Sequence, residues 1–211
     1  SERVGDIVGV PADFHIGKTR AELAGEDIKT GKWQDHIQDL KEHKPFKDQR
    51  GFFSRFFCAE EFKEIGLVKP ITQINHTLTK SKGTVRGMHF QYPPHTETKM
   101  VTCIQGSVFD VAVDIRKESP TYLQWYAEIL SKENQRALYI PDGFAHGFQT
   151  LTEGCQLLYL HSEFYTPEAE GALNVTDPQL AIHWPQPIVE ISDRDKKHPM
   201  VDDKFKGLSI K

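Results

Sequence analysis

Short apolar runs separated by turn residues dominate the chain from Phe46 onward. In the clearest stretch, residues 100–115, every second residue from Phe109 to Ile115 is a large apolar one, which is the period of a β-strand. Gly106-Ser107 divides this stretch, so we predict two strands joined at that turn. Further strands are predicted at Leu123–Leu130, Ala137–Ile140, Gly147–Leu151 and Cys155–His161, and one short helix at Ala59–Glu64.

Strands at this close spacing, with no long helices between them, favour an antiparallel sandwich or barrel over a parallel α/β sheet. The first 45 residues differ, because they are rich in Lys, Asp, Glu and Gly and their apolar positions are only weakly periodic. Ile28–Lys44 predicts a helix with Trp33, Ile37 and Leu40 on one stripe. We therefore divide the chain into an N-terminal arm (1–45), one β domain (46–200) and a C-terminal tail (201–211).

The formal net charge of -4 gives no broad basic surface, so we expect neither nucleic acid nor a membrane as a partner. An anionic ligand would have to be held by local charges. No apolar run approaches the roughly 20 residues that span a bilayer, and residues 1–5 do not resemble a signal peptide, which predicts a cytoplasmic protein. The three cysteines are far apart and read as buried apolar residues.

A first group of candidate functional residues lies between Arg86 and Lys99. Arg86, His89 and Lys99 can form a cationic pocket in which the histidine titrates near neutral pH. Strict alternation along a strand puts Arg86 and His89 on opposite faces, unless a bulge at Gly87 brings them together. The alternative is a hydrogen-bonded structural histidine beside a solvated arginine.

A second group is Pro141-x-Gly143-x-x-His146, a tight turn that sets a histidine at the start of the next strand. It resembles the second motif of the cupins, in which that histidine is often a metal ligand. The first cupin motif needs a His-x-His pair, whereas this chain has His89-Phe90-Gln91. The remaining way to build a metal site is from four residues spread along the chain: His89, His95, Glu97 and His146.

Two later segments add an acid and a carboxylate. Tyr159 and His161 share one face of a predicted strand, and a tyrosine that faces a pocket can act as a general acid. Asp195, in the segment from Ile191, can orient a histidine. The alternatives are a core tyrosine with a satisfied hydroxyl and a solvated charged turn.

In chain order these segments resemble the dTDP-4-dehydrorhamnose 3,5-epimerase family of sugar-nucleotide epimerases, over about Phe46 to Pro199. The matching motifs are DQRGFF (48–53), QINH (73–76), GTVRGMHFQ (83–91), VFDVAVD (108–114), SPT (119–121), IPDGFAHGF (140–148) and LY (158–159). The resemblance implies a cupin-type antiparallel β jelly roll with a few short helices, all-β in class. It also implies a homodimer and a nucleotide-sugar substrate.

The activity that the resemblance implies is inversion at C3, C5 or both of a nucleoside-diphosphate 4-keto-6-deoxyhexose through an enolate. By motif match His89 is the base, Asp195 orients it, Tyr159 is the general acid and Lys99 lies near the sugar 4-oxygen. The matched substrate-binding positions are Arg50, Phe53, Gln73, Asn75, Arg86, His146, Phe164 and Tyr165. The ketone itself is the electron sink, so we expect no metal and no other cofactor.

The chain departs from the family pattern at three places. Arg55 stands where a glutamate is usual, Phe164-Tyr165 replaces Tyr-Tyr, and Leu160-His161 replaces a lysine and a small polar residue. These changes leave the nucleotide base, the sugar and the number of inverted centres open. Two other functions stay as alternatives: a metal-dependent cupin isomerase or dioxygenase that uses His89, Glu97 and His146, and a sugar-nucleotide binding module without catalysis.

Overall fold

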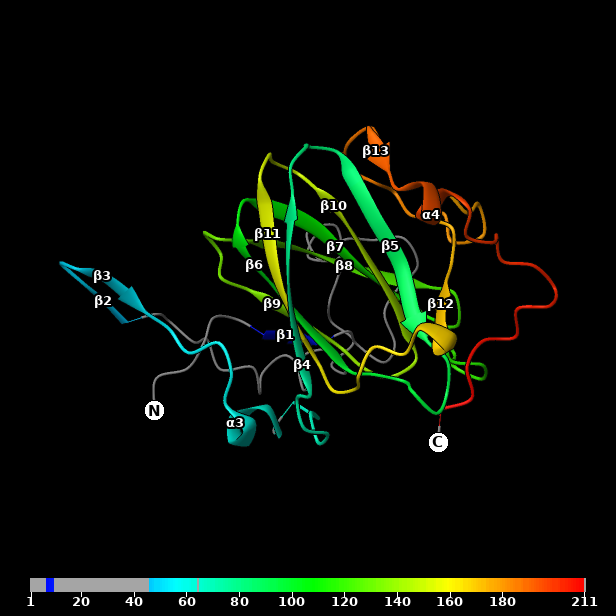
Figure 1. Ribbon diagram of the computed structural model, residues 1–211, viewed down its shortest axis with the longest axis horizontal. Helices are drawn as coiled ribbons and strands as arrows, with labels where there is room; N and C mark the ends of the chain where they lie inside the picture. Colours follow the sequence, from blue (N-terminus) through cyan, green and yellow to red (C-terminus); the bar gives the residue numbers. More distant parts are fainter. Residues whose placement is uncertain (1–6, 10–45, 64, 211) are drawn as a thin grey trace, which may run out of the picture.

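Two β-sheets packed face to face form the body of the protein (Figure 1). The computed structural model describes residues 7–9, 46–63 and 65–210, so the helix predicted at Ile28–Lys44 lies outside the described residues. The first sheet, here the β4 sheet, has the order β1 (Ile7–Gly9), β9 (Ala137–Ile140), β6 (Lys99–Gln105), β11 (Cys155–His161) and β4 (Gln73–Thr79).

The second sheet, here the β5 sheet, carries most of the inward-facing histidines. Its order is β12 (Glu170–Ala172), β5 (Thr84–Gln91), β10 (Phe144–Thr150), β7 (Ser107–Asp114) and β8 (Trp125–Ser131), with β13 (Glu190–Ile191) also paired to β5. Neighbours are antiparallel except for β1 with β9 and β13 with β5. The remaining elements are the hairpin β2 (Phe46–Asp48) and β3 (Gly51–Phe53), helices α3 (Ala59–Lys63) and α4 (Asp193–Lys196), and a 3-10 turn at Pro167–Ala169.

This architecture confirms the predicted antiparallel jelly roll. The strands predicted at Ala137–Ile140 and Cys155–His161 have the predicted bounds, and the predicted short helix is present at Ala59–Lys63. Gly106 does form the predicted turn, with a positive φ of 76°. However, β6 and β7 lie in different sheets, so this turn carries the chain from one layer to the other instead of closing a hairpin.

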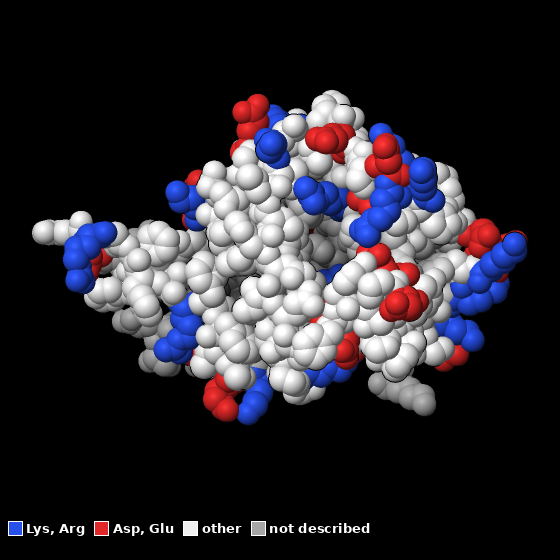
Figure 2. Space-filling model, viewed as in Figure 1, with Lys and Arg blue, Asp and Glu red and all other residues white. Residues whose placement is uncertain are grey.

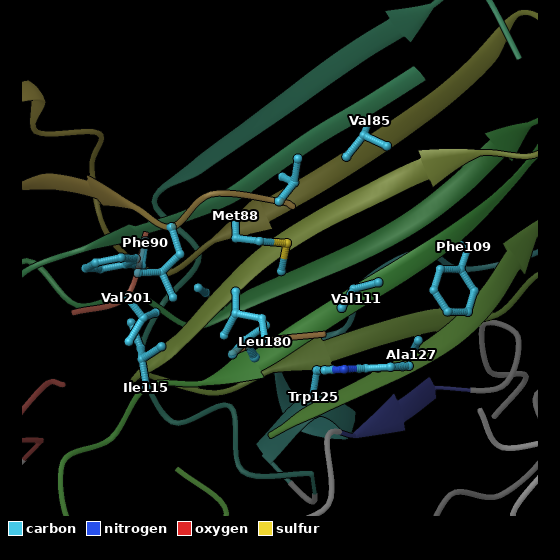
Figure 3. Packing of buried hydrophobic residues seen from close by; sticks show 14 of the residues in the cluster. Val85, Met88, Phe90, Phe109, Val111, Ile115, Trp125, Ala127, Leu180 and Val201 are labelled. Carbon is cyan, nitrogen blue, oxygen red and sulfur yellow. The ribbon is translucent and has the colours of Figure 1, made fainter. Parts of the chain in front are cut away.

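The β5 sheet is buried on both faces, which explains why β7 reads as almost continuously apolar. Val108 and Ala112 point inward, into a core cluster shared with the β4 sheet. Phe109, Val111 and Val113 point outward, into a second cluster that the segment after β12 covers (Figure 3).

The C-terminal residues are part of that second cluster. Val201 and Leu208 pack in it and are 7% and 3% exposed. Leu208 also forms a bridge with Arg116, two residues after the end of β7. Residues 201–210 therefore help to hold the outer face of the sheet that carries His89. Among the helices of the described residues, none is long and apolar enough to cross a lipid bilayer.

Leu208→Ala should lower the free energy of unfolding by about 2–5 kcal/mol, because it leaves a cavity in a packed cluster. Urea unfolding followed by circular dichroism measures this loss. Met200→Ala is the matched control, since Met200 is 47% exposed, and its cost should stay within about 0.5 kcal/mol. Equal costs for the two variants would contradict this packing of the C-terminal residues.

Candidate active site

A β-bulge brings Arg86 and His89 to the same face of β5. On β10, His146 pairs with His89 and Phe148 pairs with Arg86, so one residue on β10 is matched by two on β5. The additional residue reverses the alternation of side chains along β5. The bulge that the sequence allowed at Gly87 is present, and both side chains face the space between the sheets together with His146.

Two glycines permit this bulge. Gly87 has a φ of +136°, and a Cβ at this position would lie 2.5 Å from the Cα of Gly147 on β10. A Cβ on Gly147 would in turn lie 2.5 Å from the sulfur of Met88. Any side chain at either position would therefore push the two strands apart at the point where they set the direction of His89.

Asp195 holds His89 from outside the sheet. His89 Nε2 lies 2.9 Å from Asp195 Oδ1, and the amide of Gly87 donates to Oδ2 at 3.4 Å. The Asp195 backbone N–H donates to Ser192 Oγ at 3.0 Å, which caps α4 and fixes the carboxylate in place.

The ionisation of Asp195 fixes the tautomer of His89. Burial alone would raise the pKa of Asp195, but hydrogen bonding and the charge of His89 outweigh it and lower that pKa to about 2. An ionised carboxylate can only accept a hydrogen bond, so the proton of neutral His89 sits on Nε2. Nδ1 is then the basic nitrogen of the ring.

His198 shares the same carboxylate oxygen, at 3.2 Å, and its ring meets that of His89 edge-on at 5.6 Å. His89, Asp195 and His198 are the one group in the described part of the chain whose donor atoms lie close enough to hold a metal ion. Arg194 opposes a cation there, because its Nη2 lies 3.3 Å from His89 Nε2 and its Nε lies 3.7 Å from Asp195 Oδ1.

The structure does not assemble the other metal sites considered from the sequence. His95, Glu97 and His146 do not join His89 in any such group among residues 46–63 and 65–210. Glu97 binds Lys99 and His161, and His146 binds Asp110. The donor set proposed for a metal-dependent cupin is therefore divided among separate ion pairs.

Tyr159 faces these histidines from the β4 sheet. Its ring lies 5.9 Å from that of His146 and stacks at 6.2 Å on that of His161. Burial raises the pKa of the Tyr159 hydroxyl well above its usual value, although the neighbouring Thr77 side chain and the charge of Arg86 act in the opposite direction. The hydroxyl is therefore protonated at neutral pH and can donate a proton into the space between the sheets.

Asp110 is an element of the site to which the sequence analysis gave no role. It is fully buried on β7, and its Oδ1 lies 2.9 Å from His146 Nε2. Burial raises the pKa of Asp110, and the neighbouring His146 counteracts this only in part. The sequence pattern could have indicated a role for Asp110, because it is a charged residue on the inward face of an apolar strand.

Lys99 supplies a buried cation at the start of β6. Its Nζ lies 3.0 Å from Glu97 Oε1, and both side chains are 9% exposed. Glu97 Oε2 accepts a hydrogen bond from His161 Nδ1 at 2.7 Å. Burial alone would raise the pKa of Glu97, but Lys99 and His161 together lower it, so this carboxylate is ionised.

The remaining predicted residues line the open edge between β4 and β5. Gln73 and Asn75, on edge strand β4, pair with His161 and Tyr159. Phe164 and Tyr165 follow β11 and are 62% and 52% exposed. Figure 2 shows a hollow between β4 and β5, with basic side chains at its border.

The structure does not bring Arg50 and Phe53 to this group. They lie on the β2–β3 hairpin, which extends away from the two sheets (Figure 1). The Arg50 side chain is 89% exposed and contacts Asp48, and Phe53 is 64% exposed. Arg55, which stands where the family has a glutamate, forms an ion pair with Glu61 at 2.9 Å.

A cupin-type jelly roll whose interior holds a carboxylate-bound histidine opposite a protonated tyrosine defines a class of enzyme that moves protons on a bound substrate. The sequence model described as dTDP-4-dehydrorhamnose 3,5-epimerase matches residues 36–203. The chain belongs to this family.

Individual relatives agree. The dTDP-4-dehydrorhamnose 3,5-epimerase of Salmonella typhimurium is 45% identical over 165 residues, which cover 77% of this chain and 90% of the relative. The dTDP-6-deoxy-D-glucose-3,5-epimerase of Legionella pneumophila, solved with dTDP-4-keto-L-rhamnose, is 40% identical. Its TM-score is 0.75, with 80% of this chain and 90% of that chain covered.

A 3'-monoepimerase of Streptomyces bikiniensis, solved with dTDP-quinovose, is also similar, at 33% identity and a TM-score of 0.68. The match covers 74% of this chain and 80% of that chain. Proteins of similar fold and sequence therefore bear names for inversion at one centre as well as at two.

Asp195→Asn should change how stability depends on pH. Because the pKa of Asp195 is lowered from 3.8 to about 2 on folding, the ionised form stabilises the protein above about pH 4, by on the order of 2 kcal/mol, and this contribution is lost as the pH falls through about 2. The asparagine variant lacks it. The difference in unfolding free energy between parent and variant should therefore fall by about half between about pH 6 and about pH 3. Urea unfolding at both pH values tests this, and an unchanged difference would contradict the assigned ionisation.

Proposed function

We propose that this chain is an epimerase that inverts C3, C5 or both of a dTDP-linked 4-keto-6-deoxyhexose. The observation that carries the proposal is the 2.9 Å contact between His89 and Asp195 on one sheet, with Tyr159 facing it from the other. Membership of the epimerase family and the dTDP-sugar complexes of its relatives support the substrate class.

His89 is the proposed base. Its Nδ1 takes the proton from the carbon beside the C4 ketone, and the ring becomes an imidazolium. Asp195 stabilises that imidazolium through the hydrogen bond to Nε2 and keeps the ring from turning. The electron pair of the broken C–H bond moves onto the ketone oxygen, which gives an enolate.

Three cationic or hydrogen-bonding groups face the position of that enolate. Lys99 is the proposed electrophile, because its ammonium has three donors and the contact with Glu97 at 3.0 Å uses one of them. Arg86 and His146 border the same space from the β5 sheet. The ketone serves as the electron sink, so this scheme uses neither a metal nor another cofactor.

Tyr159 is the proposed acid. Its raised pKa keeps the phenol protonated until the enolate carbon, a far stronger base, takes the proton. The base and the acid lie on opposite sheets, so removal and return of the proton from opposite faces of the sugar inverts the carbon. His89 then releases its proton to solvent and Tyr159 takes one up from solvent, so both groups return to their starting states.

The nucleotide is proposed to lie at the open edge, against Gln73, Asn75, Phe164 and Tyr165. Arg50 and Phe53 are too far out on the hairpin to join them within one chain. We therefore propose a homodimer in which each hairpin reaches the partner subunit, because its phenylalanines are unusually exposed for a single chain. Phe46, Phe52 and Phe53 are 53%, 55% and 64% exposed. A cytoplasmic location stays a prediction from the sequence.

The proposed reaction requires exchange of carbon-bound protons with solvent. Incubation of the protein with dTDP-4-keto-6-deoxyglucose in deuterium oxide should place deuterium at C3, C5 or both, and NMR identifies which. Absence of exchange at both carbons would overturn the proposal. Tight dTDP binding without exchange would favour the binding module instead. Loss of exchange on removal of a stoichiometric metal would favour the metal-dependent cupin.

His89→Asn and Tyr159→Phe should affect this exchange differently. His89→Asn should slow it by more than about 100-fold, because it removes the base. Tyr159→Phe should retain exchange at the carbon that His89 deprotonates but slow formation of the inverted sugar. His76→Asn is a matched control, since His76 lies on an exposed position of β4 and bonds Gln156. Equal behaviour of the two pocket variants would contradict the assigned roles.

Analytical ultracentrifugation should give twice the mass of the chain. Replacing both Phe52 and Phe53 by Asp should yield a monomer, because two charges would have to be buried at the interface. The same variant should weaken dTDP binding if Arg50 acts in the partner's pocket. A parent protein that sediments as a monomer at all concentrations would contradict the dimer.

A further inference from the structure

Glu97 and His161 form a buried pair to which the proposed chemistry gives no task. Their side chains are 9% and 11% exposed. A charged pair at this depth is costly unless its hydrogen bonds are satisfied. The pair belongs to a chain of five hydrogen bonds that runs in a fixed order from Lys99 to Tyr165.

The ionised carboxylate of Glu97 determines which group donates in each hydrogen bond of this chain. Ionised Glu97 can only accept, so Lys99 Nζ donates to Oε1 at 3.0 Å and His161 Nδ1 donates to Oε2 at 2.7 Å. With its proton on Nδ1, neutral His161 offers Nε2 as an acceptor. Asn75 Nδ2, which lies 3.3 Å from Nε2, must then be the donor.

The chain of hydrogen bonds continues from Asn75 to the edge of the pocket. Asn75 Oδ1 is left to accept from Gln73 Nε2 at 3.1 Å, and Gln73 Oε1 accepts from the backbone N–H of Tyr165 at 3.2 Å. His161, Asn75 and Gln73 each have one donor and one acceptor committed in this chain of hydrogen bonds. The protonation and position of the groups at the Lys99 end therefore determine how the side-chain amides of Asn75 and Gln73 are oriented at the other end.

We propose that His161 is a positioning residue that couples Lys99, at the sugar end of the pocket, to Asn75 and Gln73, at the nucleotide end. The inference rests on the proposed function, which places the sugar at Lys99 and the nucleotide at Asn75. The acceptor nitrogen of His161, Nε2, fixes the Asn75 amide with its donor nitrogen, Nδ2, toward the imidazole. His161 also holds Glu97 so that only one carboxylate oxygen is directed at Lys99.

Three contacts suit His161 to this task. It lies on β11 between Lys99 of β6 and Gln73 of β4, so it spans the two strands that carry the ends of the chain of bonds. Its ring stacks on Tyr159 at an angle of 25°, which restricts rotation about the side-chain bonds. Its backbone carbonyl accepts from the Thr72 N–H at 2.8 Å, which anchors the strand end.

The test compares His161→Leu with His161→Gln and uses dTDP as the probe. Leucine fills similar space but removes both hydrogen bonds, so the Asn75 amide loses its orientation and dTDP should bind about tenfold more weakly by calorimetry. Glutamine restores one donor and one acceptor, and its affinity for dTDP should stay within about threefold of the parent.

Kinetics give a second readout. His161→Leu should raise KM and also lower kcat for dTDP-4-keto-6-deoxyglucose, because Glu97 loses a partner and draws Lys99 away from the ketone. His161→Gln should recover both parameters. His76→Leu is the matched control: His76 neighbours Asn75 on β4 but lies on the opposite face and bonds Gln156, so its removal should change neither parameter.

A double-variant cycle guards against a fold defect in His161→Leu. Asn75→Leu weakens dTDP binding by itself, and adding it to His161→Leu should cost less than it costs in the parent, because the two residues act through one bond. Parent-like dTDP affinity in His161→Leu would overturn the proposal, as would fully additive losses. A parent that binds dTDP but exchanges no protons would sink the proposed function, while the calorimetry would still decide the role of His161.

Discussion

The close approach of Gly87 and Gly147 is the constraint on which the site depends. Without a bulge at this point, β5 would present His89 to the outer core cluster, where Phe109 and Trp125 pack, and Arg86 alone of the two would face the space between the sheets. The bulge changes the direction of one side chain at the cost of two positions at which only glycine fits. It also exposes the Gly87 amide to Asp195, so the same distortion that turns the histidine inward helps to bind its carboxylate.

A second theme is the repeated pairing of a histidine with a carboxylate. Asp195 holds His89, Asp110 holds His146 and Glu97 holds His161. In the pairs of Asp195 and Glu97 the ionised carboxylate determines which ring nitrogen carries the proton. The three carboxylates differ in the direction of their pKa shifts, because the pKa values of Asp195 and Glu97 are lowered whereas burial raises that of Asp110. The two firmly ionised carboxylates lie next to the proposed base and the proposed electrophile.

The sequence predicted the fold class well, because the strands are short and apolar and their boundaries carry turn residues. It predicted β9 and β11 to the residue, since each is buried over most of its length. It did not predict β4, because most of that strand is polar or exposed and shows no apolar alternation. It also could not assign β6 and β7 to different sheets, because a tight glycine turn looks alike whether it closes a hairpin or links two layers.

The site residues likewise fall into two groups: those that a local sequence pattern indicates, and those that only the folded chain brings together. Residues placed by a local pattern, such as Tyr159 beside His161, could be found from strand periodicity alone. Asp195 and His89 are 106 positions apart, and only the folded chain brings them to 2.9 Å. The resemblance to a family supplied that pairing before the structure did, but it gave no role to Asp110, His198 or Glu97.

The ion pair at Lys99 bears on how the pocket distinguishes an enolate from a ketone. A lone buried ammonium would attract any oxygen strongly and would bind substrate and intermediate alike, which lowers KM without raising kcat. Glu97 at 3.0 Å already neutralises much of that charge, so a neutral ketone gains little from the contact. An enolate oxygen carries a full charge and competes with the carboxylate for the ammonium. In the proposed reaction the pair therefore favours the charged intermediate over the bound ketone. Glu97 must then be held in place, which is the task proposed for His161.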